Sequence, residues 1–341
     1  MKVGKLAIAA VAASALVLAG CSSSDSDSAA ESTEDTAASE DSGDSGDSGD
    51  SGGTGPKICM VTHGDGGGFW SVAKAGADKA GEDLPVQFTY QETTNDAQLQ
   101  AQLIESFISE GCDGIAVSAP NPDAISDALA KADEAGIPIV TMNSGSKVFK
   151  DLGAFTHVGQ DEFIAGQEAG IKFKEAGVSK VLCPIQEQNN IGLQERCDGA
   201  ADTFGNVENL QLSAGLADIA QSQAEIQAKL EADPDIDAVF ALNADIATQA
   251  AKPAAEAVGR DVMIGTVDLS GEAVQAIADG ELAFAIDQQQ YAQGYMSVVL
   301  LYLNLINGHE LGGGQPVYTG PGFVLQENAE LVQELAANGT R

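Results

Sequence analysis

The chain has 341 residues and a formal net charge of −35, with 51 acidic side chains against 16 Lys and Arg. Such an acidic protein repels nucleic acids and anionic lipid headgroups, and it lacks the positive patch that a nucleic-acid reader needs. We therefore expect neither class of partner.

The first 21 residues have the pattern of an export signal. Lys2 and Lys5 form a positive region, Leu6–Leu18 is apolar, and small residues lead to Cys21. The apolar run is shorter than the roughly 20 residues that span a bilayer. Residues 18–21, Leu-Ala-Gly-Cys, resemble the lipobox of bacterial lipoprotein signals. This resemblance implies removal of residues 1–20 and a lipid on the Cys21 sulfur. An ordinary signal peptide followed by an unrelated cysteine is the alternative.

The segment after this signal is acidic and of low complexity. Residues 22–55 hold ten carboxylates, no basic residue and no aromatic or branched apolar residue, with Asp-Ser-Gly repeats from 41 to 52. Such a segment cannot bury enough surface to offset its ordering entropy. We expect residues 21–55 to be a disordered, lipid-anchored tether that holds the folded part off the outer face of the cell membrane. A tether of this length suits a cell surface with one membrane and a thick wall, which favours a Gram-positive source. Because this segment contributes −10 and Lys2 with Lys5 contribute +2, residues 56–341 carry −27 of the total charge.

From residue 57 onward, short apolar runs alternate with amphipathic segments, which predicts parallel α/β architecture. The first series has predicted strands at 57–62, 86–90, 114–118 and 137–142 and predicted helices at 71–82, 97–109 and 124–135. The second has predicted helices at 163–176, 192–203, 220–231, 246–258, 271–278 and 291–306 and predicted strands at 180–185, near 210, and at 238–242, 262–267 and 282–286. Two such series predict two sheets. Ligands of open parallel sheets bind at the carboxyl ends of the strands.

A glycine-rich turn and two aromatic residues, His63-Gly64-Asp65-Gly66-Gly67-Gly68-Phe69-Trp70, follow the first predicted strand. A phosphate cradle of the G-x-G-x-x-G type would need glycine where Phe69 stands, so we expect no dinucleotide. Core packing is one interpretation of Phe69 and Trp70. The other is an aromatic plate for the C–H face of a sugar ring, which a pair of aromatics at a strand end favours.

Polar side chains follow the other predicted strands, namely Asn143, Arg196, Asn243, Asp268 and Gln288. Each alone could be a cap or a turn residue. Together they form a convergent set of donors and acceptors for hydroxyl groups. Hydrogen bonds to charged groups contribute about 1.5–3 kcal/mol each, so several of them with aromatic stacking could supply the roughly 8 kcal/mol of a micromolar complex.

At this point the chain resembles the sugar-binding type I periplasmic binding proteins, the ribose- and galactose-binding group of ABC importers. The resemblance spans roughly residues 56–326 and rests on Phe69-Trp70 and on segments 111–115, 135–140, 233–241 and 280–282. It implies two Rossmann-like lobes joined by three crossover strands near 157–159, 287–290 and 316–320. Lobe 1 would comprise residues 56–158 plus 289–317, and lobe 2 residues 159–288 plus 318–341.

The resemblance also implies a function. The chain would capture a sugar, polyol or cyclitol and deliver it to an ABC permease as a monomer, without catalysis and without a cofactor. The family's ligand contacts fall on Phe69, Trp70, Asn143, Arg196, Asn243, Asp268 and Gln288, with His63, Asp65 and Ser144 as candidate additional contacts. Ribose binders carry Asp-Arg where this chain has Asn143-Ser144, which argues against ribose itself. The alternatives are a receptor that presents a signal or sugar to a sensor kinase, and an extracellular enzyme with Asp268 and Asp287 as a carboxylate pair.

Export permits disulfides, and the preferred pairing joins Cys183, at the end of a predicted strand, to Cys197 beside Arg196. Buried free thiols are the alternative, and no pairing is assigned to Cys59 and Cys112. The three histidines, His63, His157 and His309, do not have the spacing of metal ligands, so we expect no metal site. No nucleophile elbow or His-based triad is present in the sequence.

Overall fold

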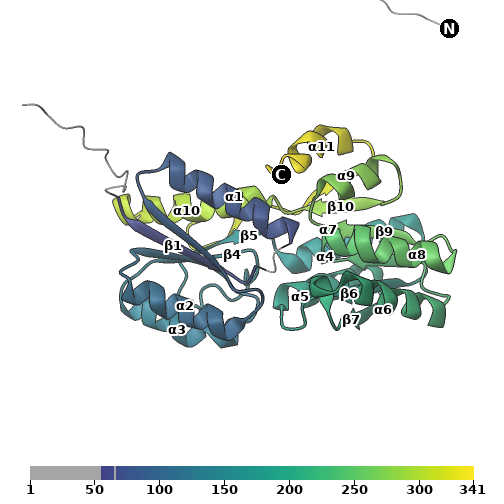
Figure 1. Cartoon of the computed structure of the whole chain (residues 1–341), viewed down its shortest axis with the longest axis horizontal. Coiled ribbons are helices and arrows are strands. Elements are labelled where there is room, and N and C mark those ends of the chain that lie inside the picture. The colour runs from purple at the N-terminus through teal and green to yellow at the C-terminus, as the bar shows by residue number, and fades with distance from the viewer. Residues whose placement is uncertain (1–54, 65–66) are drawn as a thin grey trace, which may run out of the picture. The chain divides into compact units, whose positions relative to one another are not determined.

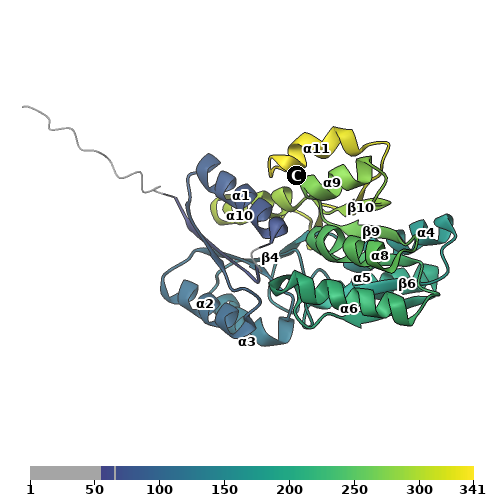
Figure 2. The same ribbon diagram turned by 45° about the vertical axis from the view of Figure 1, so that its right-hand side comes forward.

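The computed structural model describes residues 55–64 and 67–341. The predicted signal, Cys21, the tether and Asp65 lie outside the described residues. Two six-stranded sheets, each flanked by helices, organise the described part (Figures 1 and 2). Within this part, no helix has the length and apolar character needed to cross a membrane.

The first sheet is entirely parallel, with the order β11 (Val317–Tyr318), β5 (Thr156–Gly159), β4 (Ile139–Met142), β3 (Gly114–Ser118), β1 (Lys57–Thr62), β2 (Gln87–Glu92). The second has the order β12 (Gly322–Val324), β10 (Phe284–Asp287), β9 (Met263–Val267), β8 (Ala238–Ala241), β6 (Val181–Ile185), β7 (Val207–Gln211). Only the β12–β10 pair of the second sheet is antiparallel. The chain crosses between the sheets after β5, after β10, and between β11 and β12. The predicted fold class is therefore confirmed.

Helices cover both faces of each sheet. Those on the first sheet are α1 (Gly68–Asp83), α2 (Ala97–Ser109), α3 (Pro122–Glu134) and α10 (Gln290–Asn307). Those on the second are α4 (Glu162–Ala176), α5 (Ile191–Phe204), α6 (Ile219–Ala232), α7 (Ala244–Ile246), α8 (Lys252–Val258), α9 (Gly271–Ala278) and α11 (Ala329–Ala337). A 3-10 turn, η1 (Gly215–Ala217), precedes α6, and a π-helical turn, η2 (Ala247–Ala251), joins α7 to α8.

Each sheet has an apolar cluster on either face, because successive strand residues point to opposite sides. In β3, Ile115 and Val117 pack with α2 and α3, whereas Ala116 packs with α1 and α10. The helices α1 and α10 lie side by side (Figure 1). Glycine permits this approach, because a Cβ at Gly76 would overlap the Tyr291 carbonyl and one at Gly294 the Ala73 carbonyl.

Two local features differ from the sequence expectations. The helix expected at 246–258 is divided by the π-helical turn just before Pro253, which stands at the second position of α8. Proline lacks an N–H and clashes with the carbonyl four residues earlier, so the α-helical ladder changes there. The terminal helix α11 was not predicted, although Ala329, Val332 and Ala336 recur at helical spacing and are buried against α9.

Two buried disulfides are present. Cys183–Cys197, the preferred pairing, joins β6 to α5, and Cys59–Cys112, for which no pairing was assigned, joins β1 to the turn before β3. The sequence places Cys59 and Cys112 near the starts of two strands, but only the β1–β3 pairing makes those strands neighbours.

Candidate functional site

The carboxyl ends of strands from both sheets meet at one pocket, which we call the inter-lobe pocket. Its lining residues are His63, Phe69, Trp70, Asn143, Gln186, Glu187, Asn190, Leu193, Arg196, Leu242, Asn243, Asp268 and Gln288. All seven residues predicted as principal ligand contacts are therefore brought together, with His63. Ser144 does not line the pocket but contacts a residue that does, and Asp65 lies outside the described residues. The volume is about 30 Å³, enough for a water or two. A sugar ring does not fit in this volume, so its binding requires the lining residues of the two lobes to move apart.

Phe69 and Trp70 form the aromatic wall of the pocket from the first turn of α1. Their ring centroids lie 4.9 Å apart at 81°, and the Trp70 ring lies 4.7 Å from that of His63 at 75°. These edge-to-face arrangements are the ones that aromatic quadrupoles favour. Both side chains also belong to the apolar cluster under α10. The core and ligand-plate interpretations of this pair are therefore compatible.

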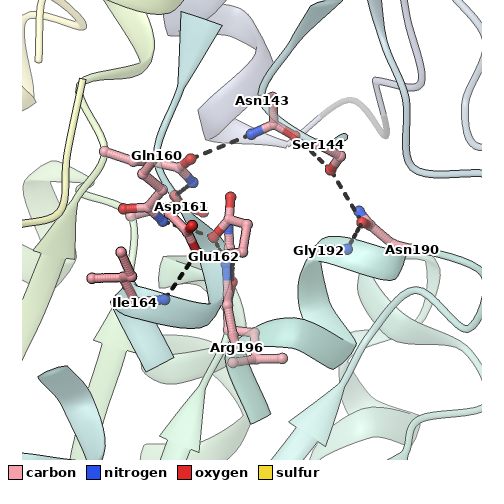
Figure 3. A network of polar contacts seen from close by, with 12 residues as sticks. Asn143, Ser144, Gln160, Asp161, Glu162, Ile164, Asn190, Gly192 and Arg196 are labelled. Atoms are coloured by element: carbon pink, nitrogen blue, oxygen red, sulfur yellow. Dashed lines mark hydrogen bonds and ion pairs between the residues drawn. The ribbon is translucent and has the colours of Figure 1, made fainter. Parts of the chain in front are cut away.

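Arg196 projects from α5 and forms a buried ion pair with Glu162 in the first turn of α4 (Figure 3). Its Nε and Nη2 donate to the two Glu162 carboxylate oxygens over 2.6 and 3.0 Å, and Nη1 donates to the Leu242 carbonyl over 2.9 Å. Both side chains are at most 5% exposed. The Arg196 fork is thus held rigidly while the residue still lines the pocket.

Burial acts to lower the pKa of the Arg196 guanidinium, but the neighbouring carboxylates, Glu162 foremost and then Asp268, together raise that pKa above its ordinary value. Arg196 is therefore permanently charged, and Glu162 supplies its counter-charge. Sequence reasoning missed Glu162, because an acidic residue at the start of a helix is also what the helix dipole favours.

Asp268, Asn243 and Gln288 form a second polar group. The Gln288 amide donates to one Asp268 oxygen, and Asn243 Nδ2 lies 3.4 Å from the other. Asp268 and Asn143 have φ of 75° and 60°, a left-handed conformation that Asp and Asn adopt more readily than most residues. Strain of this kind concentrates at functional sites.

Asn190 links the lobes across the pocket, and it was not predicted. Its Oδ1 accepts from the Ser144 hydroxyl over 3.1 Å (Figure 3), and its Nδ2 donates to Glu187 over 2.6 Å. His63 Nε2 lies 3.4 Å from Asn190 Nδ2 and 3.6 Å from the Glu187 carboxylate. Asn190 also caps α5 by accepting from the Gly192 amide. In the sequence, Asn190 resembles an ordinary N-cap residue before a helix, so its contacts with the other lobe could not be predicted.

The residues that line the pocket offer hydrogen bonding and aromatic stacking to a ligand. Asp287, the imagined partner of Asp268 in a carboxylate pair, does not line the pocket and instead accepts from Arg341 Nε over 2.7 Å. Within residues 55–64 and 67–341, no three His, Cys, Asp or Glu side chains are placed to hold a metal ion. The arrangement of amides, carboxylate and guanidinium beside aromatic rings suits a ligand rich in hydroxyl groups.

Comparison with known proteins gives consistent results. A family model described as "Periplasmic binding protein domain" matches residues 58–310. The xylose/arabinose-binding protein XylF of Sulfolobus acidocaldarius is 27% identical over 264 residues, which cover 73% of this chain and 65% of that protein. This chain thus spans just under two thirds of XylF. The ribose import binding protein RbsB of Escherichia coli is 25% identical over 64% of this chain and 75% of its own length.

Solved structures extend the comparison. A carbohydrate transporter from Acidothermus cellulolyticus, crystallised in complex with myo-inositol, is 39% identical with a TM-score of 0.81. The match covers 84% of this chain and all of that one. The arabinose-binding protein AraP of Geobacillus stearothermophilus is 25% identical with a TM-score of 0.63 over 81% of this chain and 99% of its own.

Proposed function

The chain belongs to the periplasmic binding protein family, and from this premise we propose that it is the substrate-binding lipoprotein of a sugar-type ABC importer. It captures a neutral sugar, polyol or cyclitol between its lobes and delivers it to the permease without changing it chemically. The observation that carries this proposal is the meeting of aromatic, amide and charged side chains from both sheets in one pocket.

The charges of the pocket favour a neutral ligand. Glu162 balances the one guanidinium among the lining residues, Arg196, and the pocket also contains Asp268 and Glu187. An anionic ligand would have to compete with these carboxylates for the Arg196 guanidinium, whereas hydroxyl groups can donate hydrogen bonds to the carboxylates. The 39% identical protein with bound myo-inositol supports a cyclitol as the first ligand to test.

Ligand capture would use contacts that only the closed lobes complete. The Ser144–Asn190 hydrogen bond and the approach of His63 to Glu187 join residues that follow strands of different sheets. The Ile191 amide also donates to the Pro120 carbonyl over 3.0 Å, and Lys147 pairs with Glu195 over 3.5 Å. Hydroxyl groups that bridge Asn143, Arg196 and Asp268 would add to these direct contacts between the lobes.

The proposal includes the placement of the protein. Residues 1–20 serve as a lipoprotein signal, Cys21 carries the lipid, and residues 21–55 form the tether. The lobes comprise 56–158 plus 289–317 and 159–288 plus 318–341. The mature protein works as a monomer on the outer face of a Gram-positive cell membrane, where it meets the permease.

Isothermal titration calorimetry tests the binding function. Myo-inositol, xylose, arabinose, ribose and fructose are titrated into wild-type protein and into Asp268→Asn, with Asp279→Asn, at an exposed helix end, as the matched control. We expect at least one compound to bind and Asp268→Asn to weaken it by about 1.5–3 kcal/mol, or roughly 10- to 150-fold. The absence of binding to any compound, or equal losses in both variants, would contradict the proposal. Recovery of altered sugar would support the enzyme alternative.

A further inference from the structure

A second cavity, of about 230 Å³, lies beside the inter-lobe pocket, and we call it the side cavity. The two share His63, Gln186, Glu187 and Asn190 as lining residues. The other walls of the side cavity come from the segments that follow β2 and β3 in the first sheet and β6 and β7 in the second. It is therefore formed between the lobes, at the same strand edges as the inter-lobe pocket.

The side cavity has the chemistry of a hydroxyl-binding site. Half of its fourteen lining residues carry a carboxamide, and none is Lys or Arg. A carboxamide both donates and accepts hydrogen bonds, as a hydroxyl does. Glu187 is the only carboxylate in the wall, and no Lys or Arg there would balance the charge of a bound phosphate or carboxylate group. The wall thus suits neutral, hydroxylated groups.

Some polar groups of this wall have hydrogen-bonding capacity that the protein does not use. Gln100 is fully buried, and its Nε2 donates to the Ser118 carbonyl over 2.8 Å. Its Oε1 accepts no hydrogen bond from the described residues, and neither does Oε1 of Gln186. Asn121 occupies the N-cap position of α3, but its side chain makes no capping bond. The two Oε1 atoms are closed to a water-sized probe, so they help to shape the wall and do not face the cavity. Asn121 is partly exposed, so a ligand hydroxyl group could bond its carboxamide directly.

The volumes of the two cavities determine what a closed complex encloses. A lone ring in the inter-lobe pocket would leave the 230 Å³ of the side cavity to solvent. A ligand that continues past His63 and Glu187 would fill it and would contact both lobes there. Those contacts exist only in the closed form, so they would contribute directly to closure.

We infer that the side cavity is a second subsite, which holds a neutral, hydroxyl-bearing group attached to the ring in the inter-lobe pocket. The preferred ligand is accordingly a glycoside or similarly extended polyol. This inference rests on the proposed function, and it adds the class of substrate.

The test compares free rings with their glycosides in three pairs: myo-inositol and galactosyl-myo-inositol, xylose and xylobiose, fructose and sucrose. Ala97→Phe fills the side cavity from the first turn of α2 without touching the inter-lobe pocket. Asn121→Ala removes a polar group from its wall. Ala124→Phe, on the exposed side of α3, is the matched control for the added ring. Melting temperatures verify that each variant is folded.

We expect one glycoside to bind wild-type protein at least tenfold more tightly than its free ring. Ala97→Phe should abolish this advantage and leave the affinity for the free ring within twofold, Asn121→Ala should reduce glycoside affinity about fivefold, and Ala124→Phe should change neither. If the free ring binds and every glycoside binds more weakly, or if Ala97→Phe weakens both ligands alike, the second subsite is refuted while the binding function stands. If neither member of any pair binds, the proposed function itself fails.

Discussion

Replacing Glu162 by Gln should destabilise the protein strongly, because it leaves Arg196 buried without a counter-charge. The substitution keeps the shape of the side chain but removes its charge and replaces one of the two oxygens that accept from Arg196, over 2.6 and 3.0 Å, by an NH2 donor. Removing one partner of a buried ion pair costs about 3–5 kcal/mol. Asp268 also attracts the guanidinium, so we expect the lower end, about 3 kcal/mol. With a slope near 3 kcal/mol per molar urea, the unfolding midpoint should fall by about 1 M.

The assay is urea unfolding followed by circular dichroism. Glu168→Gln is the matched control, because Glu168 lies on the same helix and is exposed. Its midpoint should stay within about 0.2 M of wild type, since exposed substitutions usually change stability by less than 0.5 kcal/mol. A Glu162→Gln midpoint equal to that of Glu168→Gln would refute the reasoning.

The double variant Glu162→Leu with Arg196→Met separates stability from ligand binding. Apolar replacement of both members of a buried pair is often neutral or stabilising, so this variant should unfold within about 1 kcal/mol of wild type. It should nevertheless lose affinity for any ligand that Arg196 contacts. Retained affinity in a folded double variant would limit Arg196 to a structural role.

Three further results are expected. Burial lowers the pKa of His157 from 6.5 to about 3. Because the unfolded chain binds a proton that the folded protein excludes, the free energy of unfolding should fall as the pH drops below about 6.5 towards 3. In urea unfolding, His157→Gln should reduce the loss of stability between pH 7 and pH 5 by about 2 kcal/mol. The Cys183→Ala, Cys197→Ala double variant opens a loop of 14 residues and should lose about 3 kcal/mol under non-reducing conditions, whereas an unchanged melting temperature would show that the disulfide does not stabilise the native protein. Trp70 is the only tryptophan in the sequence and lines the inter-lobe pocket. A bound ligand should therefore change the fluorescence of the wild type but not that of Trp70→Phe. If calorimetry shows that a ligand binds and the wild-type emission stays unchanged, this would count against stacking on the Trp70 ring.

The sequence by itself determined the class of fold and the principal residues of the pocket. Apolar runs such as 114–118, separated by amphipathic helices such as 97–109, specify parallel strands because local periodicity reflects which faces are buried. Since parallel strands end at one edge, residues directly after them, such as Asn143 and Asp268, could be assigned to a common site from sequence position alone.

Only the tertiary structure decided which of these groups meet across the lobes. Glu162 and Asn190 looked like ordinary residues at helix starts, and their contacts with Arg196 and Ser144 depend on how two distant helices are placed. The same holds for the side cavity, whose walls come from four separate strand ends. Periodicity and turn chemistry describe neighbours along the chain. Contacts between elements depend instead on packing and on the closure of one lobe against the other, which no local pattern encodes.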